Sequence, residues 1–123
     1  MTDRLFAVRG AIQVDANEAD AILTATSELL GALIERNGID SGRMVSCLFT
    51  CTPDLNAEFP AVAARELGLS SVPLLCAREI DVPGAMPRVI RVMVHYYAAH
   101  QHRPSHTYLR EAQSLRTDLE AAQ

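Results

Sequence analysis

Charged residues interrupt apolar segments at three places in this chain of 123 residues. Arg91 lies within the segment Val-Ile-Arg-Val-Met-Val (89–94), Glu79 follows Leu-Leu-Cys-Ala-Arg (74–78), and Arg9 ends a short apolar run. Burying a guanidinium among aliphatic side chains is costly unless an anion or hydrogen-bond acceptors meet it. The pattern therefore predicts an anionic partner for Arg91, and three such charges on separate strands suggest one common site.

A structural explanation of these charges fits the residues equally well. Arg91 and Glu79 could pair across neighbouring strands as an ion pair, with Arg9 on a solvated sheet edge. The residues by themselves leave both hypotheses open.

Cysteine and histidine chemistry receives little support from the spacing. Three cysteines without a repeated C-x-x-C argue against a disulfide framework and a structural zinc site, and favour a reducing cytosol. A single thiol in an apolar run, such as Cys76, is more often packing than nucleophile. The four histidines match no metal-ligand spacing and are expected to be solvated loop residues: His95, His100, His102 and His106.

Composition excludes several classes of partner. Eleven cations against fifteen anions give a net charge of −4, so no basic field exists for nucleic acid or an anionic membrane. All eleven cations are arginine, which excludes Schiff-base and P-loop lysine chemistry. No signal-peptide layout or membrane-spanning run is visible, and we expect a cytoplasmic protein.

The elements that position these residues follow from hydrophobic periodicity and from the turn residues. The expected strands are 4–14, 44–50, 72–80 and 89–97, and the expected helices are 17–37 and 60–67. Residues 108–120 fit either a helix or a short strand with a tail. Loop aromatics are usually core, so Phe59 is expected to pack inward, with a lid over a ligand as the alternative. The chain is thus predicted to be one α+β domain over 1–123, with a tail from about residue 116.

Four segments resemble the monofunctional chorismate mutases of the Bacillus type. These segments are VRGAIQV (8–14), CTPDLNAEFPAVAAREL (51–67), VPLLCAREIDVPG (72–84) and IRVMV (90–94). They occur in the family's order, and the resemblance extends from Arg9 to about Asp118.

The resemblance implies a fold, an assembly and a reaction. Members of that family have a mixed β-sheet with flanking helices and assemble into a barrel-like homotrimer with active sites between subunits. A shared site agrees with chain length, because so short a chain buries only roughly two-thirds of its unfolded surface. The family rearranges chorismate to prephenate, on the way to phenylalanine and tyrosine, with no metal, cofactor or covalent intermediate.

The resemblance also implies residue roles. Arg91 would donate to the ether oxygen of chorismate, where negative charge develops in the transition state. Arg9 would bind a carboxylate and Tyr108 the same enolpyruvyl side chain, while Glu79 and Cys76 would contact the ring hydroxyl. The neighbouring subunit would supply a cleft wall of Phe59, Ala61 and Arg65. Further residues would line or close the cleft: Leu74, Leu75, Leu115 and Arg116.

Two departures from the family pattern and two rival hypotheses remain. Val62 stands where relatives often have a lysine, and the segment after residue 110 is less β-like than its family counterpart. One rival is a non-catalytic trimer that binds a small carboxylate metabolite through Arg9 and Arg91. In the other, the charges serve assembly alone.

Overall fold

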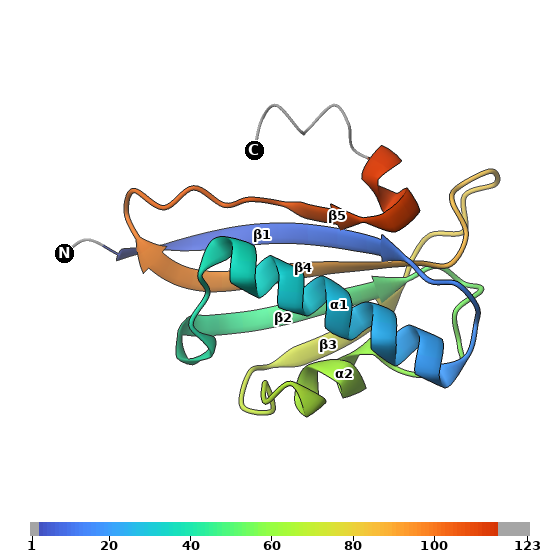
Figure 1. Ribbon diagram of the computed structural model, residues 1–123, viewed down its shortest axis with the longest axis horizontal. Helices are drawn as coiled ribbons and strands as arrows, with labels where there is room; N and C mark the ends of the chain where they lie inside the picture. The colour runs from blue at the N-terminus through green and yellow to red at the C-terminus, as the bar shows by residue number, and fades with distance from the viewer. Residues whose placement is uncertain (1–2, 116–123) are drawn as a thin grey trace.

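A five-stranded mixed sheet forms the centre of the computed structural model, which describes residues 3–115 (Figure 1). The strands are β1 (Asp3–Gln13), β2 (Met44–Cys51), β3 (Leu74–Arg78), β4 (Val89–Ala99) and β5 (Thr107–Leu109). They lie in the order β3-β2-β4-β1-β5. The long central strand β4 is antiparallel to both of its neighbours, and the two edge strands β3 and β5 run parallel to theirs. The predicted mixed sheet is confirmed.

Two α-helices, which contact each other, pack on one face of this sheet. They are α1 (Ala19–Asn37) and α2 (Pro60–Glu66), and two short 3-10 turns, η1 (Ser41–Arg43) and η2 (Arg110–Ser114), complete the elements. Helix α1 ends at Gly38, whose φ of 58° is the left-handed conformation that glycine adopts without strain. Proline at the first position of α2 costs no hydrogen bond, because that N–H is unsatisfied in any helix.

The core lies between the helices and this face of the sheet. Alternate residues of β4 are buried there, from Ile90 to Tyr96, against Leu29, Leu30 and Leu33 of α1. Gly10 permits the close approach of α1 and β5, since a Cβ at this position would lie 2.7 Å from the Thr107 carbonyl oxygen. The sheet, the helix and the C-terminal strand therefore fit together around a residue without a side chain.

The expected elements are largely confirmed, with differences at their ends. Strand β3 is shorter than 72–80, and Glu79 follows it immediately. As far as residue 115, the C-terminal segment forms a short strand and a 3-10 turn rather than a regular α-helix. The tail expected from about residue 116 lies outside the described residues. Pairing of β5 with β1 sets this outcome, because tertiary contacts override the helix propensity of the segment. No helix within residues 3–115 has both the length and the hydropathy needed to cross a membrane.

The opposite face of the sheet is open over much of its area. No α-helix of residues 3–115 covers it, and η2 packs over one end, against Ala11 and Val89. Strand alternation directs Arg9, Thr50 and Arg91 to this open face, because their sequence neighbours point into the core. Five large apolar side chains also lie exposed on the strands: Leu5, Val45, Leu48, Leu75 and Tyr97.

Candidate active site

A cavity of about 470 Å³ lies on the open face and collects residues from four strands. Its lining includes three of the residues expected to bind substrate: Arg9 of β1, Arg91 of β4 and Tyr108 of β5. The remaining lining residues are Gly10, Leu48, Thr50, Val92 and Met93. Residues separated by up to about a hundred positions in the sequence are thus brought to one place.

Strand register positions the two arginines. Arg91 lies opposite Ala11 of β1, and Arg9 lies opposite Met93 of β4. The arginines are therefore diagonal neighbours on one face of an antiparallel pair, within reach of one small ligand. Two guanidinium groups at this separation suit a ligand with more than one anionic group.

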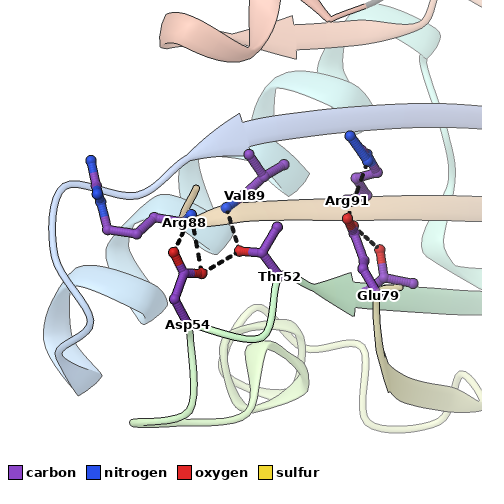
Figure 2. Close-up of polar contacts among 7 residues, drawn as sticks. Thr52, Asp54, Glu79, Arg88, Val89 and Arg91 are labelled. Atoms are coloured by element: carbon purple, nitrogen blue, oxygen red, sulfur yellow. Dashed lines mark hydrogen bonds and ion pairs between the residues drawn. The ribbon is translucent and has the colours of Figure 1, made fainter. Parts of the chain in front are cut away.

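Glu79 supplies the anionic partner that the sequence predicted for Arg91. Its carboxylate Oε1 accepts from Arg91 Nη1 at 3.3 Å (Figure 2), and its Oε2 accepts from the Thr50 hydroxyl at 2.5 Å. The backbone N–H of Glu79 donates to the Cys51 carbonyl at 2.9 Å, which holds this residue beside β2 after β3 has ended. The Glu79 carboxylate is therefore held from two directions.

The burial predicted for Arg91 is only partly found. The Glu79 side chain is 16% exposed, whereas that of Arg91 is 43% exposed. An ion pair in which one partner is half-exposed is weakened by solvent, so this pair alone contributes little to the free energy of unfolding. A guanidinium has five N–H donors and Glu79 engages Nη1, so the arrangement leaves Arg91 able to bind a ligand in the cavity.

A second hydrogen-bond network fixes the start of β4. The Asp54 carboxylate accepts twice from the Arg88 backbone N–H, at 3.0 and 3.2 Å, and accepts from the Thr52 hydroxyl at 2.6 Å (Figure 2). Thr52 Oγ1 also accepts from the Val89 N–H at 2.9 Å. Arg88 has a φ of 53°, which side-chain-bearing residues adopt only when the surroundings hold them there. This network determines where β4 begins, at Val89, two residues before Arg91.

The expectation of solvated loop histidines is wrong for three of the four. His106 Nδ1 accepts from the Arg9 backbone N–H at 3.0 Å, and His102 hydrogen-bonds the Tyr96 hydroxyl at 2.6 Å. His95 lies in β4 and contacts Ser46 at 3.0 Å. The segment before β5 runs back along β1, which encloses groups that composition alone predicts to be solvated. Burial, followed by the charge of Arg9, lowers the pKa of His106.

Other expected residues form a second group, at the α2 side of the sheet. Phe59 and Cys76 line a separate cavity of about 460 Å³ between the loop before α2 and β3. The expectation that Phe59 packs in the core is wrong, because its side chain is 65% exposed. Helix α2 buries Ala61 and its neighbouring alanines, which leaves the preceding Phe59 outside, and Arg65 is exposed at the helix end.

The three expected leucines line neither of these two cavities. Leu115 packs beside Tyr108 in a small cluster at the end of the open face. Leu74 packs against the main core, whereas Leu75 is 62% exposed on β3. The last expected position, Arg116, lies outside the described residues. Within one copy of the chain, the expected site residues therefore do not form a single cleft.

Cys47 and Cys51 are buried thiols, and the described part of the chain gathers no cluster of metal ligands. Burial, with a smaller contribution from nearby Cys76, raises the pKa of Cys47 and of Cys51 to about 12, so both thiols are protonated at neutral pH. Within residues 3–115, no cluster of three or more His, Cys, Asp or Glu side chains could hold a metal ion. The side chains of the cavity can instead bind, orient and stabilise charge.

Thr50 is the polar residue that sequence reasoning missed. It lies on the open face directly opposite Arg91 and bonds Glu79. Its alternation with buried Phe49 and Cys51 was visible in the sequence, but its partner depends on the register between β2, β3 and β4. Leu48 and Met93, which complete the apolar lining, were missed for the same reason.

Together, the open mixed sheet and its arginine-lined cavity define a small α+β domain with a cavity suited to a compact anionic ligand. Residues 5–119 match the sequence profile of the family described as chorismate mutase type I. The chain belongs to this family.

Individual relatives agree with this assignment. The chain is 51% identical over 118 residues to chorismate mutase AroH of Thermus thermophilus, covering 94% of this chain and 97% of that protein. It is 40% identical over 114 residues to chorismate mutase AroH of Bacillus subtilis (strain 168), with coverages of 91% and 90%. A solved chorismate mutase from Clostridium thermocellum superposes with a TM-score of 0.80 at 41% identity, covering 88% of this chain and 97% of that one.

Proposed function

We propose that the chain rearranges chorismate to prephenate at the cavity around Arg91. It is a chorismate mutase, an isomerase that serves aromatic amino acid biosynthesis, by its family and its relatives. The observation that supports this site most is the gathering of Arg9, Arg91 and Tyr108 in one cavity, with Glu79 paired to Arg91. The reaction forms one C–C bond and breaks one C–O bond within one molecule. It therefore requires no proton carrier, redox partner or covalent intermediate.

Arg91 stabilises the transition state in this proposal. As the C–O bond breaks, negative charge grows on the ether oxygen, and a fixed cation lowers the energy of that state more than that of the substrate. Arg91 suits this role because its planar group donates to two acceptors at once and Glu79 restrains it. A cation that is already oriented needs no reorganisation when the charge appears.

Arg9 and Tyr108 hold the enolpyruvyl side chain over the ring. Arg9 pairs with a substrate carboxylate and Tyr108 donates to the same side chain, which selects the compact reactive conformer. Glu79 accepts from the ring hydroxyl and keeps Arg91 in place. None of these three residues needs to gain or lose a proton in its role.

The proposed assembly is a homotrimer in which neighbouring subunits complete each cleft. Two observations support it: the open sheet face carries exposed apolar side chains, and the expected site residues form two separate groups. Such a face is costly to leave in water and is typical of a subunit interface. In the trimer, Arg91 of one subunit would face a cleft wall that the next subunit supplies through Phe59, Ala61 and Arg65. We place this enzyme in the cytoplasm, where its free cysteines stay reduced.

Mixing two inactive variants tests the shared cleft. Arg91→Ala removes one half of each site and Arg65→Ala the other, so either homotrimer is expected to lose most of its turnover of chorismate. Trimers assembled from equal amounts of both should contain about one quarter of sites with both halves intact. Recovery of turnover on refolding the mixture, confirmed as prephenate, supports the proposal. A mixture no more active than its components contradicts it, and chorismate binding without turnover by wild type favours a metabolite-binding protein.

A further inference from the structure

We propose that Thr50 is a positioning residue that fixes the carboxylate of Glu79, and through it Arg91. The Thr50 hydroxyl donates to Glu79 Oε2 at 2.5 Å, while Arg91 Nη1 donates to Glu79 Oε1 at 3.3 Å. This inference rests on the proposed function, because it assigns a role in the same reaction. It adds a residue to the site and explains why the carboxylate and the guanidinium stay aligned.

The sheet register puts Thr50 between the two groups. Thr50 lies opposite Arg91 on β4 at one side and opposite Ala77 on β3 at the other. Glu79 follows Ala77 by two positions, just after β3 ends at Arg78. The hydroxyl of Thr50 is therefore presented at the point where the side chains of Arg91 and Glu79 converge, and Thr50 itself lines the cavity.

Glu79 needs this restraint because of its place in the chain. Its backbone N–H is bound to Cys51, but its side chain extends beyond the last paired residue of β3. The terminal torsion of a glutamate is broad, so two contacts are needed to fix the plane of the carboxylate. The side chain is 16% exposed, and water is a poor substitute for a missing donor there.

Thr50→Val removes the hydroxyl and retains the branched shape. A hydrogen bond to a charged group contributes enough that we expect a loss of about ten- to one hundredfold in kcat/KM. The loss should fall mainly on kcat, because a misaligned Arg91 weakens the transition state more than the bound substrate. Thr50→Ser restores the donor and should stay within about threefold of wild type. Thr26→Val makes the same change in α1, far from the cavity, and should leave kcat/KM unchanged.

A double-mutant cycle separates positioning from strand stability. In a Glu79→Ala background the hydroxyl has no carboxylate to hold, so adding Thr50→Val should change kcat/KM by less than about twofold. Urea unfolding and the oligomeric state of each variant establish that it is folded. A crystal structure of Thr50→Val should show the Glu79 carboxylate rotated away from Arg91.

Three results would overturn the inference: wild-type kcat/KM in Thr50→Val, an equal loss in both backgrounds, or an unmoved carboxylate in the variant. The failure of the proposed function has a different signature, since wild type itself would not turn over chorismate. The position of the carboxylate in the crystal would then still test Thr50.

Discussion

Arg9 and Arg91 lie on neighbouring antiparallel strands, two positions out of register and on the same open face of the sheet. Two positive side chains so close together repel each other and would destabilise an isolated sheet. The carboxylate of Glu79 offsets this repulsion at Arg91. No other acidic side chain within residues 3–115 forms an ion pair with Arg9 or Arg91. In the proposed site, the dicarboxylate chorismate would supply the missing negative charge.

We predict that Gly10→Ala destabilises the protein. A Cβ would lie 2.7 Å from the Thr107 carbonyl oxygen and 3.0 Å from Leu29 Cδ1, so β5 or α1 must move. The expected loss is about 1–3 kcal/mol in the free energy of unfolding. The measurement is urea denaturation monitored by circular dichroism.

Gly31→Ala is the matched control. Gly31 lies within α1 with nothing inside 4 Å of its added Cβ, so alanine should stabilise the protein by about 0.5–1 kcal/mol. Equal effects of the two substitutions would show that β5 does not pack against β1 as described.

We predict that stability falls as the pH is lowered through the range in which His106 titrates. Burial and Arg9 lower the pKa of His106 below its ordinary value of 6.5 in the folded protein, so the unfolded chain binds this proton more readily. The contribution is complete above about pH 6.5 and is lost as the pH drops through the folded-state pKa. The melting temperature at pH 7.5 and pH 5.5 measures the effect.

His106→Asn separates this group from others that titrate. Asparagine can still accept from the Arg9 N–H but carries no titrating group, so the variant should lose less stability between the two pH values. His100→Asn, at an exposed turn, should behave as wild type. An identical pH dependence in all three proteins would exclude His106 as the source.

We predict a flat dependence of kcat on pH around neutrality, between about pH 6 and 8. No group transfers a proton in the proposed reaction, and arginine stays protonated throughout this range. Initial rates of chorismate loss in buffers of constant ionic strength provide the test. A bell-shaped profile centred near the pKa of histidine would indicate general acid–base catalysis instead.

Local pattern predicted the elements well because the core is strongly periodic. Leucines at helical spacing define α1, and alternation in β4 put Arg91 on the face opposite Ile90 and Val92. The partner of Arg91 was also predictable, since a guanidinium within an apolar strand needs an acceptor. In these cases a single segment of the sequence contains all the residues on which the prediction depends.

Contacts were not predictable from the sequence where they depend on strand register or on a distant segment that folds back beside another strand. Thr50 meets Glu79 only through pairing of three strands, and His106 meets Arg9 because β5 returns beside β1. Phe59 is exposed because α2 buries the alanines that follow it. The roles of the second group, including Arg65, depend on a neighbouring copy and stay predictions.

Turnover of chorismate by wild type and by Arg91→Ala tests most directly whether the cavity around Arg91 is the active site. Removing one oriented donor to the developing charge should lower kcat at least about one hundredfold, with prephenate as the wild-type product. Arg36→Ala, which removes an exposed arginine at the end of α1, is the control and should retain wild-type kcat. A folded Arg91→Ala variant with near wild-type kcat, or a folded wild type that forms no prephenate, would contradict the account.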